Sequence, residues 1–346
     1  MKKILVIRFS SIGDIVLTTP VIRCLKNQLQ EVEIHVLTKK KFSNLYKTNP
    51  YIDKVFEYDT SLRDNISELK QENYSFVVDL QKNKRSVRVT RSLSCPHDSF
   101  PKLNLRKFLL STFKINIMPD IHIVDRYFKA VEKLGVKNDL QGLDFFISER
   151  NNYPMKELPA DFQNGYHAFV IGGTYKTKIL PAVKVAEVIN KINKPVVLLG
   201  GPDDVERAEE IISLVNKTTS QRANKLSSDS QILRFSDSQI LNLVGKINLE
   251  QSASLVKNAE SVLTNDTGLM HIAAAFHKNI VSVWGNTVPE LGMYPYLPKE
   301  PKRCHIVECK DVRCRPCSKL GFKECPKKQF RCMMEIDVER IVDSLT

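Results

Sequence analysis

No apolar run in the 346-residue sequence approaches the roughly 20 residues that a membrane-spanning helix needs. The opening stretch MKKILVIRFS has two lysines and a short apolar run, as a secretion signal does. Arg8 interrupts that run, however, and no small-residue cleavage site follows. We therefore interpret residues 1–9 as the first strand of a cytoplasmic protein. A hydrophobic content of 42% and a charged content of 26% indicate a globular chain, long enough for two domains.

The sequence also lacks the signatures of several binding functions. No G-x-G-x-x-G follows a strand, so binding of NAD is unsupported. No stacking-aromatic motif, RNA-binding signature or helix-turn-helix pattern is present, so only charge suggests a nucleic-acid-binding protein. That charge is +13 at pH 7, and it favours an anionic partner such as nucleic acid, an acidic membrane surface or a phosphorylated substrate. The alternative is a lysine-rich protein that is basic without any such partner.

Cysteine is scarce until the C-terminal part of the chain, where six of the eight cysteines lie between Cys304 and Cys332. Residues 302–331 also hold ten Lys and Arg against three Asp and Glu. In a cytoplasmic chain, clustered cysteines are more often metal ligands or reduced thiols than disulfides. A close pair followed by two single thiols suggests a structural tetrahedral zinc site. Its ligands would be Cys314, Cys317, Cys325 and Cys332. The alternative is a loosely structured, reduced basic flap.

Short apolar strands alternate with helical patterns along most of the chain, as in a doubly wound, mostly parallel α/β fold. Strands are expected at 4–7, 32–37, 51–56, 76–80, 168–171, 195–199, 262–264 and 280–284. Residues 148–165, with two prolines and three asparagines, have the composition of a linker between domains. We expect an N-terminal Rossmann-like domain, 1–155, and a C-terminal one, 166–334, with a cleft between them. The second domain includes the Cys-rich basic segment 302–332, and the polar stretch 217–230 is expected to be a surface loop.

The stretch LTNDTGLMHIAAAFHKNIVSVWG, residues 263–285, joins a strand, a short helix and another strand. Asp266 stands where an N-cap is expected, and Gly268 lies in the first turn. The start of such a helix lies at the carboxyl end of a strand, where open α/β sheets bind ligands and where free N–H groups suit phosphate. Thr267 adds a hydroxyl, Gly268 leaves the backbone accessible to an anion, and His271 follows one turn later. The alternative is an ordinary capped core helix.

A second polar turn follows the first strand, at Ser10-Ser11-Ile12-Gly13-Asp14. Two hydroxyls, a glycine and an acid at the top of the first domain are expected to face the cleft. The alternative reading of Asp14 is a helix-capping acid.

Together these segments resemble glycosyltransferase family 9, the ADP-heptose:lipopolysaccharide heptosyltransferases. The resemblance is carried by ILVIRFSSIGDIVLTTPVIRCLK, FVVDLQKNKRS, GGTYKTKILP and LTNDTGLMHIAAAFHKNIVSVWGNTVP. It implies a GT-B fold with the active site between two Rossmann-like domains. It also implies a C-terminal helix, here 335–346, that packs back on the N-terminal domain. The implied reaction is inverting transfer of heptose from an ADP-sugar to the inner core of lipopolysaccharide.

The resemblance assigns roles residue by residue. Asp14 matches the acid of the family's SSxGD motif, the proposed general base, and Lys178 matches a lysine that meets the phosphates. The residues that would bind the donor are Ser11, Gly13, Thr174, Asp204, Asp266, Thr267, Gly268, Leu269 and His271, with Asp203 as the alternative to Asp204. No DxD-like pair is evident in the donor motif, so we expect catalysis without a metal or other cofactor. This expectation concerns catalysis only and does not exclude the structural zinc site suggested by the cysteines.

The implied acceptor is an anionic, phosphorylated glycolipid at the cytoplasmic face of the inner membrane, where a peripheral protein of charge +13 would bind anionic lipid. Basic residues after the strand at 76–80 are candidates to bind its phosphates and carboxylates. They are Lys82, Lys84, Arg85, Arg88 and Arg91; the alternative is a solvated basic loop. Three rival functions remain open: another nucleotide-sugar transferase or an epimerase, a nucleic-acid-binding protein, and an inactive scaffold. The presence of Asp14, Lys178 and Asp266 argues against the last.

Overall fold

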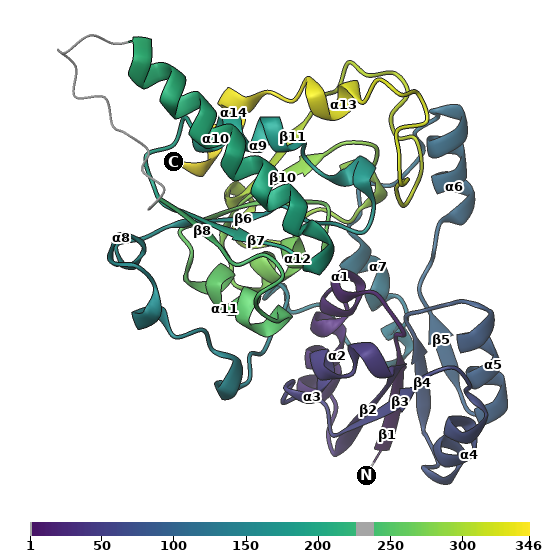
Figure 1. Cartoon of the computed structure of the whole chain (residues 1–346). Coiled ribbons are helices and arrows are strands. Elements are labelled where there is room, and N and C mark those ends of the chain that lie inside the picture. Colours follow the sequence, from purple (N-terminus) through teal and green to yellow (C-terminus); the bar gives the residue numbers. More distant parts are fainter. Residues whose placement is uncertain (1, 226–238) are drawn as a thin grey trace.

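The computed structural model describes residues 2–225 and 239–346, and it contains two parallel sheets, one in each half of the chain (Figure 1). The first sheet has the order β3-β2-β1-β4-β5. Its strands are β1 (Lys2–Ile7), β2 (Val32–Lys39), β3 (Lys54–Tyr58), β4 (Phe76–Asp79) and β5 (His97–Ser99). Both faces are buried, since alternate residues of β1 enter two different apolar clusters. This is why its strands are continuous apolar runs in the sequence.

Helices cover both faces of the first sheet. They are α1 (Ile12–Val16), α2 (Thr19–Gln28), α3 (Asn44–Lys47), α4 (Arg63–Gln71), α5 (Lys84–Leu93) and α7 (Ile123–Phe128). A further helix, α6 (Asn104–Phe108), lies away from this sheet (Figure 1). The side chains of α1, α2 and α7 pack with Ile4 and Val6, whereas Leu69 of α4 and Val89 of α5 pack on the opposite face. The segment from α6 to Lys114 leaves this domain and reaches the second one, where the Lys114 ammonium donates to the Pro316 carbonyl at 2.6 Å.

The second sheet has the order β11-β10-β9-β6-β7-β8. Its strands are β6 (His167–Val170), β7 (Val196–Leu199), β8 (Ile240–Asn242), β9 (Ser261–Asn265), β10 (Asn279–Trp284) and β11 (Cys304–Glu308). Its helices are α8 (Ala160–Gln163), α9 (Ala182–Ile189), α10 (Val205–Lys225), α11 (Leu249–Asn258), α12 (Gly268–Ala275), α13 (Arg331–Met334) and α14 (Val338–Leu345). The two parallel sheets confirm the predicted pair of Rossmann-like domains. Within the described residues, no helix combines the length and the apolar character that crossing a membrane requires.

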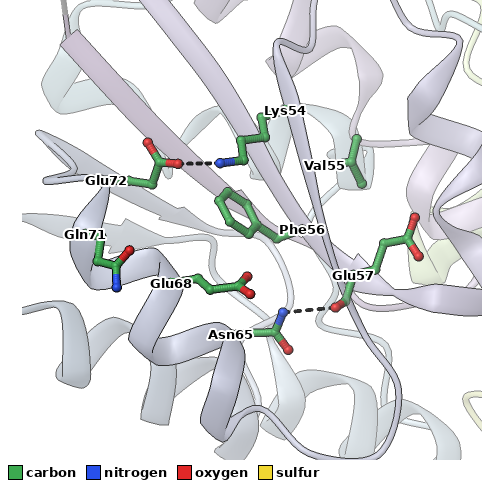
Figure 2. Close-up of a pocket in the computed structure, with 8 residues that line it drawn as sticks. All are labelled: Lys54, Val55, Phe56, Glu57, Asn65, Glu68, Gln71 and Glu72. Carbon is green, nitrogen blue, oxygen red and sulfur yellow. Dashed lines mark hydrogen bonds and ion pairs between the residues drawn. The ribbon is translucent and has the colours of Figure 1, made fainter.

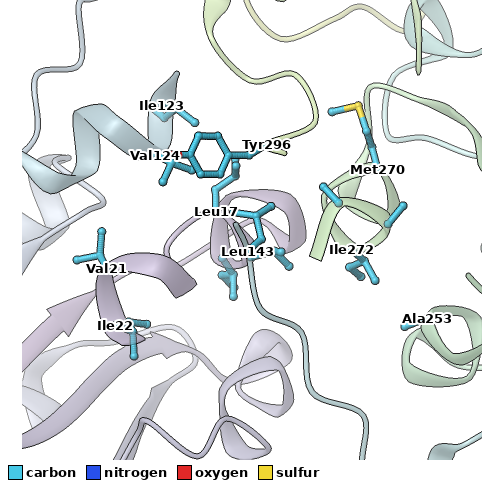
Figure 3. Packing of buried hydrophobic residues seen from close by; sticks show 14 of the residues in the cluster. Leu17, Val21, Ile22, Ile123, Val124, Leu143, Ala253, Met270, Ile272 and Tyr296 are labelled. Carbon is cyan, nitrogen blue, oxygen red and sulfur yellow. The ribbon is translucent and has the colours of Figure 1, made fainter. Parts of the chain in front are cut away.

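The domains meet where α1 of the first contacts α12 of the second. One apolar cluster continues across this junction (Figure 3), with Leu17 and Val124 from the first domain and Met270 and Ile272 from the second. Because α1 follows β1 and α12 follows β9, the carboxyl ends of the two sheets face each other at this junction. Open α/β sheets bind ligands at that edge.

Two expectations about secondary structure are wrong, and three strands were missed. Residues 217–225 continue α10 instead of forming a loop, and the Thr218 hydroxyl donates to the Leu214 carbonyl one turn earlier; the rest of the stretch 217–230 lies outside the described residues. The strand expected at 51–56 begins only at Lys54. The short strands β5, β8 and β11 were not predicted, because three to five residues of mixed polarity carry no clear period.

The family resemblance implied that the C-terminal helix packs back on the first domain. In the structure this helix, α14, packs on the second domain instead. Its apolar residues Val338, Ile341 and Leu345 enter the cluster of the second sheet, and it contacts α9, β9, β10 and β11. The Ser261 hydroxyl also donates to the Leu345 carbonyl. The expectation of a return to the N-terminal domain is therefore wrong.

The Cys-rich basic segment is an ordered wall of the second domain and not a loosely structured flap. It begins with β11, which pairs in parallel with β10. Arg315 holds the segment in place by donating to the carbonyls of Gly285 and Thr287 and by pairing with Glu308 at 2.8 Å. The Phe322 carbonyl accepts from the backbone N–H and the hydroxyl of Thr177. This wall thus lies beside the turn that carries Lys178.

Candidate active site

Asp14 lies in the first turn of α1, after the N-cap residue Ser11. Its carboxylate pairs with the Arg8 guanidinium at 2.5 Å and accepts from the Ser11 hydroxyl at 2.9 Å and the Ser11 N–H at 3.2 Å. Burial alone would raise the pKa of Asp14, but the Arg8 charge and the Ser11 hydrogen bonds outweigh it and lower the pKa below its ordinary value. Asp14 is therefore an ionised carboxylate at neutral pH, with its side chain 25% exposed.

Arg8 is a site residue for which the sequence analysis assigned no role. It directly follows β1, with only 7% of its side chain exposed, and its guanidinium donates to the Ser10 and Leu80 carbonyls and to the Tyr127 hydroxyl. A buried arginine with this many fixed partners is a rigid anchor for the carboxylate of Asp14. The only signal in the sequence was a charged residue within an apolar strand.

In the second domain, Asp266 and Lys178 form an ion pair of 2.5 Å with side chains that are 13% and 16% exposed. Lys178 ends the 3-10 turn η6 (Lys176–Lys178) after β6, and Asp266 follows β9. The Thr287 hydroxyl donates to the same carboxylate oxygen at 3.0 Å. The expectation that Asp266 caps α12 is wrong: the N-cap residue is Thr267, and the Asp266 carboxylate is engaged by the lysine and the threonine.

Two buried polar atoms at the start of α12 have no hydrogen-bond partner within the described residues, the Thr267 hydroxyl oxygen and Nδ1 of His271. Burial lowers the pKa of His271 to about 4, although the carboxylates of Asp266 and Asp14 act to raise it. The histidine is thus neutral at pH 7, and charged groups of both domains act on its pKa. Unsatisfied buried polar atoms at a helix start suit a polar ligand.

Glycines allow α1 and α12 to approach closely. A Cβ at Gly13 would lie 2.6 Å from Cδ2 of His271, and one at Gly268 would lie 2.8 Å from Cγ2 of Ile12. Since real Cβ atoms do not come so close, any side chain at either position would push the helices apart. The expectation that Gly268 leaves its backbone open to an anion is wrong on this side, because α1 fills the space.

The remaining donor-site candidates lie at the carboxyl ends of β6 and β7 or beside them. Asp204 packs against Gly172 and Gly200, and its carboxylate accepts from the Gly201 N–H at 2.9 Å. Burial raises the pKa of Asp204, whereas Asp203 is exposed. Thr174 is exposed and follows Gly173, whose added Cβ would meet the Thr267 methyl group at 3.2 Å. Leu269 packs on the interdomain apolar cluster.

The basic residues expected to bind the acceptor begin α5, which follows β4. The Lys82 ammonium donates to the Phe100 carbonyl at 2.9 Å. Burial raises the pKa of Tyr58, and the nearby charge of Arg85 acts to lower it. In the described chain, none of the five basic residues, Lys82, Lys84, Arg85, Arg88 and Arg91, is bonded to Asp14 or to its neighbours in the site. Their role stays a prediction.

The cysteines of the second domain are all free thiols. In the part of the chain that the structure describes, no three His, Cys, Asp or Glu side chains are arranged to hold a metal ion. The structure therefore does not support the zinc site expected at Cys314, Cys317, Cys325 and Cys332, which stays a prediction for elemental analysis of the purified protein. Less than about a tenth of an equivalent of zinc would contradict that prediction.

A hollow of about 600 Å³ lies elsewhere, between the edge strand β3 and α4 (Figure 2). The Lys54–Glu72 pair at 2.6 Å and the bond from Asn65 to the Glu57 carbonyl at 2.9 Å cross its lining. None of the residues expected from the sequence lines it. We therefore place the candidate site at the α1–α12 junction, where the motif residues meet.

Comparisons with known proteins point to one family. The sequence model of glycosyltransferase family 9 (heptosyltransferase) matches residues 63–322, which include Lys178 and the start of α12 but not Asp14. Lipopolysaccharide heptosyltransferase 1 of Campylobacter coli is 26% identical over 82% of this chain and 84% of its own length. Lipopolysaccharide heptosyltransferase 2 of Escherichia coli K12 is 23% identical over 83% and 84%.

Solved structures show the same fold. E. coli ADP-heptose lps heptosyltransferase II superposes with a TM-score of 0.69 at 21% identity, covering 100% of this chain and 97% of its own. The E. coli heptosyltransferase WaaC, solved with ADP, gives 0.64 at 20% identity, with 99% and 100% covered. The predicted GT-B architecture is therefore confirmed.

Proposed function

The chain belongs to glycosyltransferase family 9, and from this premise we propose that it transfers heptose from ADP-heptose to the inner core of lipopolysaccharide with inversion at the anomeric carbon. The relatives named lipopolysaccharide heptosyltransferases support the donor and acceptor class. The solved relative with ADP supports the nucleotide. The roles of individual residues rest on the geometry of the junction.

In the proposed reaction, a hydroxyl of the acceptor attacks the anomeric carbon of heptose and gives its proton to Asp14. The bond between that carbon and the diphosphate breaks, and ADP leaves with the bonding electrons. Arg8 and Ser11 hold the Asp14 carboxylate in one orientation, which a base needs in order to stay within hydrogen-bond reach of the hydroxyl.

The negative charge that develops on ADP needs positive partners. Lys178 and the backbone N–H groups at 267–269, which begin α12, are the groups we assign to the diphosphate. The Thr267 hydroxyl, which has no protein partner among the described residues, is a further donor. Lys178 would then be shared between Asp266 and the diphosphate. Since these groups supply the positive charge, we expect turnover to survive treatment with a chelator.

The observation that carries this proposal is the meeting of two charged groups from different domains. Asp14 from the first domain and the Asp266–Lys178 pair from the second are all close enough to His271 to shift its pKa. A base for the acceptor and a cation for the leaving diphosphate thus face each other across one buried histidine. This is the arrangement that an in-line displacement requires.

A panel of ADP-, UDP- and GDP-sugars tests the proposal, with deacylated inner-core oligosaccharide as the acceptor. Of the sugars in the panel, we expect only ADP-heptose to support turnover with the acceptor. NMR of the product should show the anomer opposite to that of the donor. Preference for a UDP- or GDP-sugar would contradict the donor assignment, and product formed without acceptor would indicate an epimerase or hydrolase. A retained anomer would contradict the proposed roles of Asp14 and Lys178.

We further propose that the enzyme works as a cytoplasmic, peripheral protein on the inner membrane. Exposed apolar side chains on the segment from α6 to Ile121 support this, with Leu105 71% and Phe113 59% exposed. The others on that segment are Phe108, Ile115, Ile117 and Ile121. The Cys-rich wall adds Leu320 and Phe322 beside them, and Arg106, Lys114 and Lys323 are basic neighbours. Apolar side chains among basic ones suit an anionic lipid surface.

Flotation with vesicles of phosphatidylcholine, with or without phosphatidylglycerol, tests the membrane proposal. We expect the wild type to float with the anionic vesicles and a Phe108→Ser/Phe113→Ser variant to lose most of this binding. Leu140→Ser is the matched control, since Leu140 is 49% exposed on another part of the first domain. Equal flotation of the wild type and the double variant would contradict the assignment of this surface.

A further inference from the structure

Arg126, on α7, is a buried arginine whose charge no acidic side chain neutralises within the described residues. Its residue is 2% exposed, and its Nη2 donates to the Leu291 carbonyl at 3.0 Å. Its Nε and Nη1 are buried without a hydrogen-bond partner. Burial lowers the pKa of Arg126. A buried, unpaired charge is costly in any fold, so this guanidinium is suited to an anion that is not part of the chain.

Lys107 is close enough to this arginine for the two charges to interact, and Lys102 and Lys319 interact with Lys107 in the same way. Burial, together with the positive charges of Arg126, Lys319 and Lys102, lowers the pKa of Lys107 on α6 to about 8, although the Asp14 carboxylate acts to raise it. The side chains of the three lysines make no hydrogen bond or ion pair within the described chain. We call these four residues the cationic cluster: Lys102, Lys107, Arg126 and Lys319.

The cationic cluster lies next to the proposed base. Arg8, the ion-pair partner of Asp14, donates to the hydroxyl of Tyr127, the residue after Arg126, and the Asp14 carboxylate acts to raise the pKa of both Lys102 and Lys107. Asp14 does not neutralise the cluster, because its own ion pair is with Arg8. The other nearby carboxylate, Asp79, accepts from the Ser86 hydroxyl and from two backbone N–H groups at the end of β4. Positive charge is therefore in excess at this end of the junction.

The placement of the cluster favours the acceptor over the donor. Three of its four cations come from the first domain, on the side of Asp14, whereas the groups assigned to the diphosphate, Lys178 and the start of α12, belong to the second domain. Lys319 comes from the Cys-rich wall, which contacts the first domain through Lys114. An anion bound here would lie near the acceptor hydroxyl and would be held by both domains.

We propose that the cationic cluster is a subsite for a phosphate group carried by the acceptor, beside the hydroxyl that Asp14 deprotonates. This inference rests on the proposed function for the identity of the acceptor. The planar Arg126 guanidinium has N–H groups on Nε and Nη1 without a protein partner among the described residues, and the lysines add point charges, which is a combination that recognises phosphate. The subsite would hold the acceptor in register for attack.

Lys107→Gln tests the subsite, because Lys107 has no protein partner within the described residues and its loss should leave the fold intact. With a phosphorylated inner-core acceptor, we expect KM to rise about 10–100-fold, the usual worth of a charge-assisted hydrogen bond, with little change in ADP affinity. With the dephosphorylated acceptor, wild type and variant should have similar KM values. Arg126→Lys, which keeps the charge and loses the fork, should raise KM for the phosphorylated acceptor if its thermal unfolding shows a folded protein.

Lys129→Gln is the matched control, since it removes an exposed lysine just after α7 that pairs only with Glu132. It should leave every KM unchanged. An unchanged KM in Lys107→Gln, or an equal rise with both acceptors, would overturn the proposal. Lost ADP affinity would also overturn it, because the cluster would then serve the donor.

Binding of inorganic phosphate and of pyrophosphate, followed by calorimetry on wild type and Lys107→Gln, separates this inference from the proposed function. If the wild type fails to use ADP-heptose but binds phosphate through Lys107, the proposed function fails while the anion site stands. If it uses ADP-heptose and the variant binds phosphate and acceptor as the wild type does, only the subsite fails.

Discussion

Replacing Asp14 by asparagine tests the centre of the proposed mechanism. The side chain keeps its shape and one carbonyl oxygen, so Ser11 can still donate to it as it does now at 2.9 Å. What disappears is the proton acceptor and the charge paired with Arg8 at 2.5 Å. Removal of a positioned general base costs roughly 10²–10⁴-fold in rate, and we expect that loss in kcat with both substrates saturating.

The same change should also lower stability, because it leaves a guanidinium that is 7% exposed without its carboxylate. Breaking a buried ion pair by removing one partner costs about 3–5 kcal/mol. Here Arg8 keeps its bonds to two carbonyls and to Tyr127, and Asp14 is partly exposed. We therefore expect a loss of about 1–3 kcal/mol, or a drop in Tm of roughly 3–10 °C for domains of this size.

The assay must separate these two effects. Turnover of ADP-heptose, ADP affinity by calorimetry and Tm should be measured together, at a temperature well below the Tm of the variant. Ser11→Ala is the control: it removes one hydrogen bond to the carboxylate but leaves the carboxylate itself, so kcat should fall by less than about tenfold, the worth of one ordinary hydrogen bond. A folded Asp14→Asn enzyme that keeps more than a tenth of wild-type kcat would refute the role of Asp14 as the base.

Three further outcomes follow from the site and its surroundings. Lys178→Ala should weaken ADP binding by about 1.5–3 kcal/mol, the worth of a charge-assisted contact; unchanged affinity in titration calorimetry would remove the lysine from the donor site. Burial lowers the pKa of His122 to about 3, so its unfolded state binds a proton first as pH falls below about 6.5. The contribution of neutral His122 to the free energy of unfolding should therefore be complete above that pH and fall by up to about 5 kcal/mol toward pH 3. In urea unfolding, His122→Asn should not show this part of the pH dependence. Gly13→Ala places a Cβ 2.6 Å from His271, so it should cost about 1–3 kcal/mol through overpacking and lower kcat; wild-type Tm and kcat would contradict the close approach of α1 and α12.

The local pattern of the sequence was enough to predict β1–β4, β6, β7, β9 and β10, though not the short strands β5, β8 and β11. Buried parallel strands are continuous apolar runs, and the polar turns after them stand at the carboxyl edge whatever the rest of the chain does. For this reason the turn with Asp14 and the stretch from Asp266 to His271 could be identified as site candidates before their geometry was known. The resemblance to family 9, carried by these same motifs, extended this to Lys178, which no local pattern singled out.

Tertiary structure alone decided which atoms meet. The Arg8–Asp14 pair could be suspected from neither residue, since the ordinary preference of a strand arginine is to face water. Asp266 stands at an N-cap position in the sequence but bonds to Lys178, 88 residues earlier. The Lys178 ammonium and the Thr287 hydroxyl, which follow the two strands beside β9, bind its carboxylate more strongly than one backbone N–H of a helix would. Such partners depend on contacts that no local period encodes.

The same limit explains the packing of α14 and the cationic cluster. Residues 338–345 predict an amphipathic helix, but only the shape of the second domain determines that its apolar face covers that domain's own sheet. Lys102, Lys107 and Lys319 are ordinary basic residues in the sequence, and Arg126 is one charge in a helix. The sequence determined how many positive charges the chain carries and which segments form strands. The fold decided which four of those charges lie together without an ion pair to an acid, because that depends on the course of three chain segments around one junction.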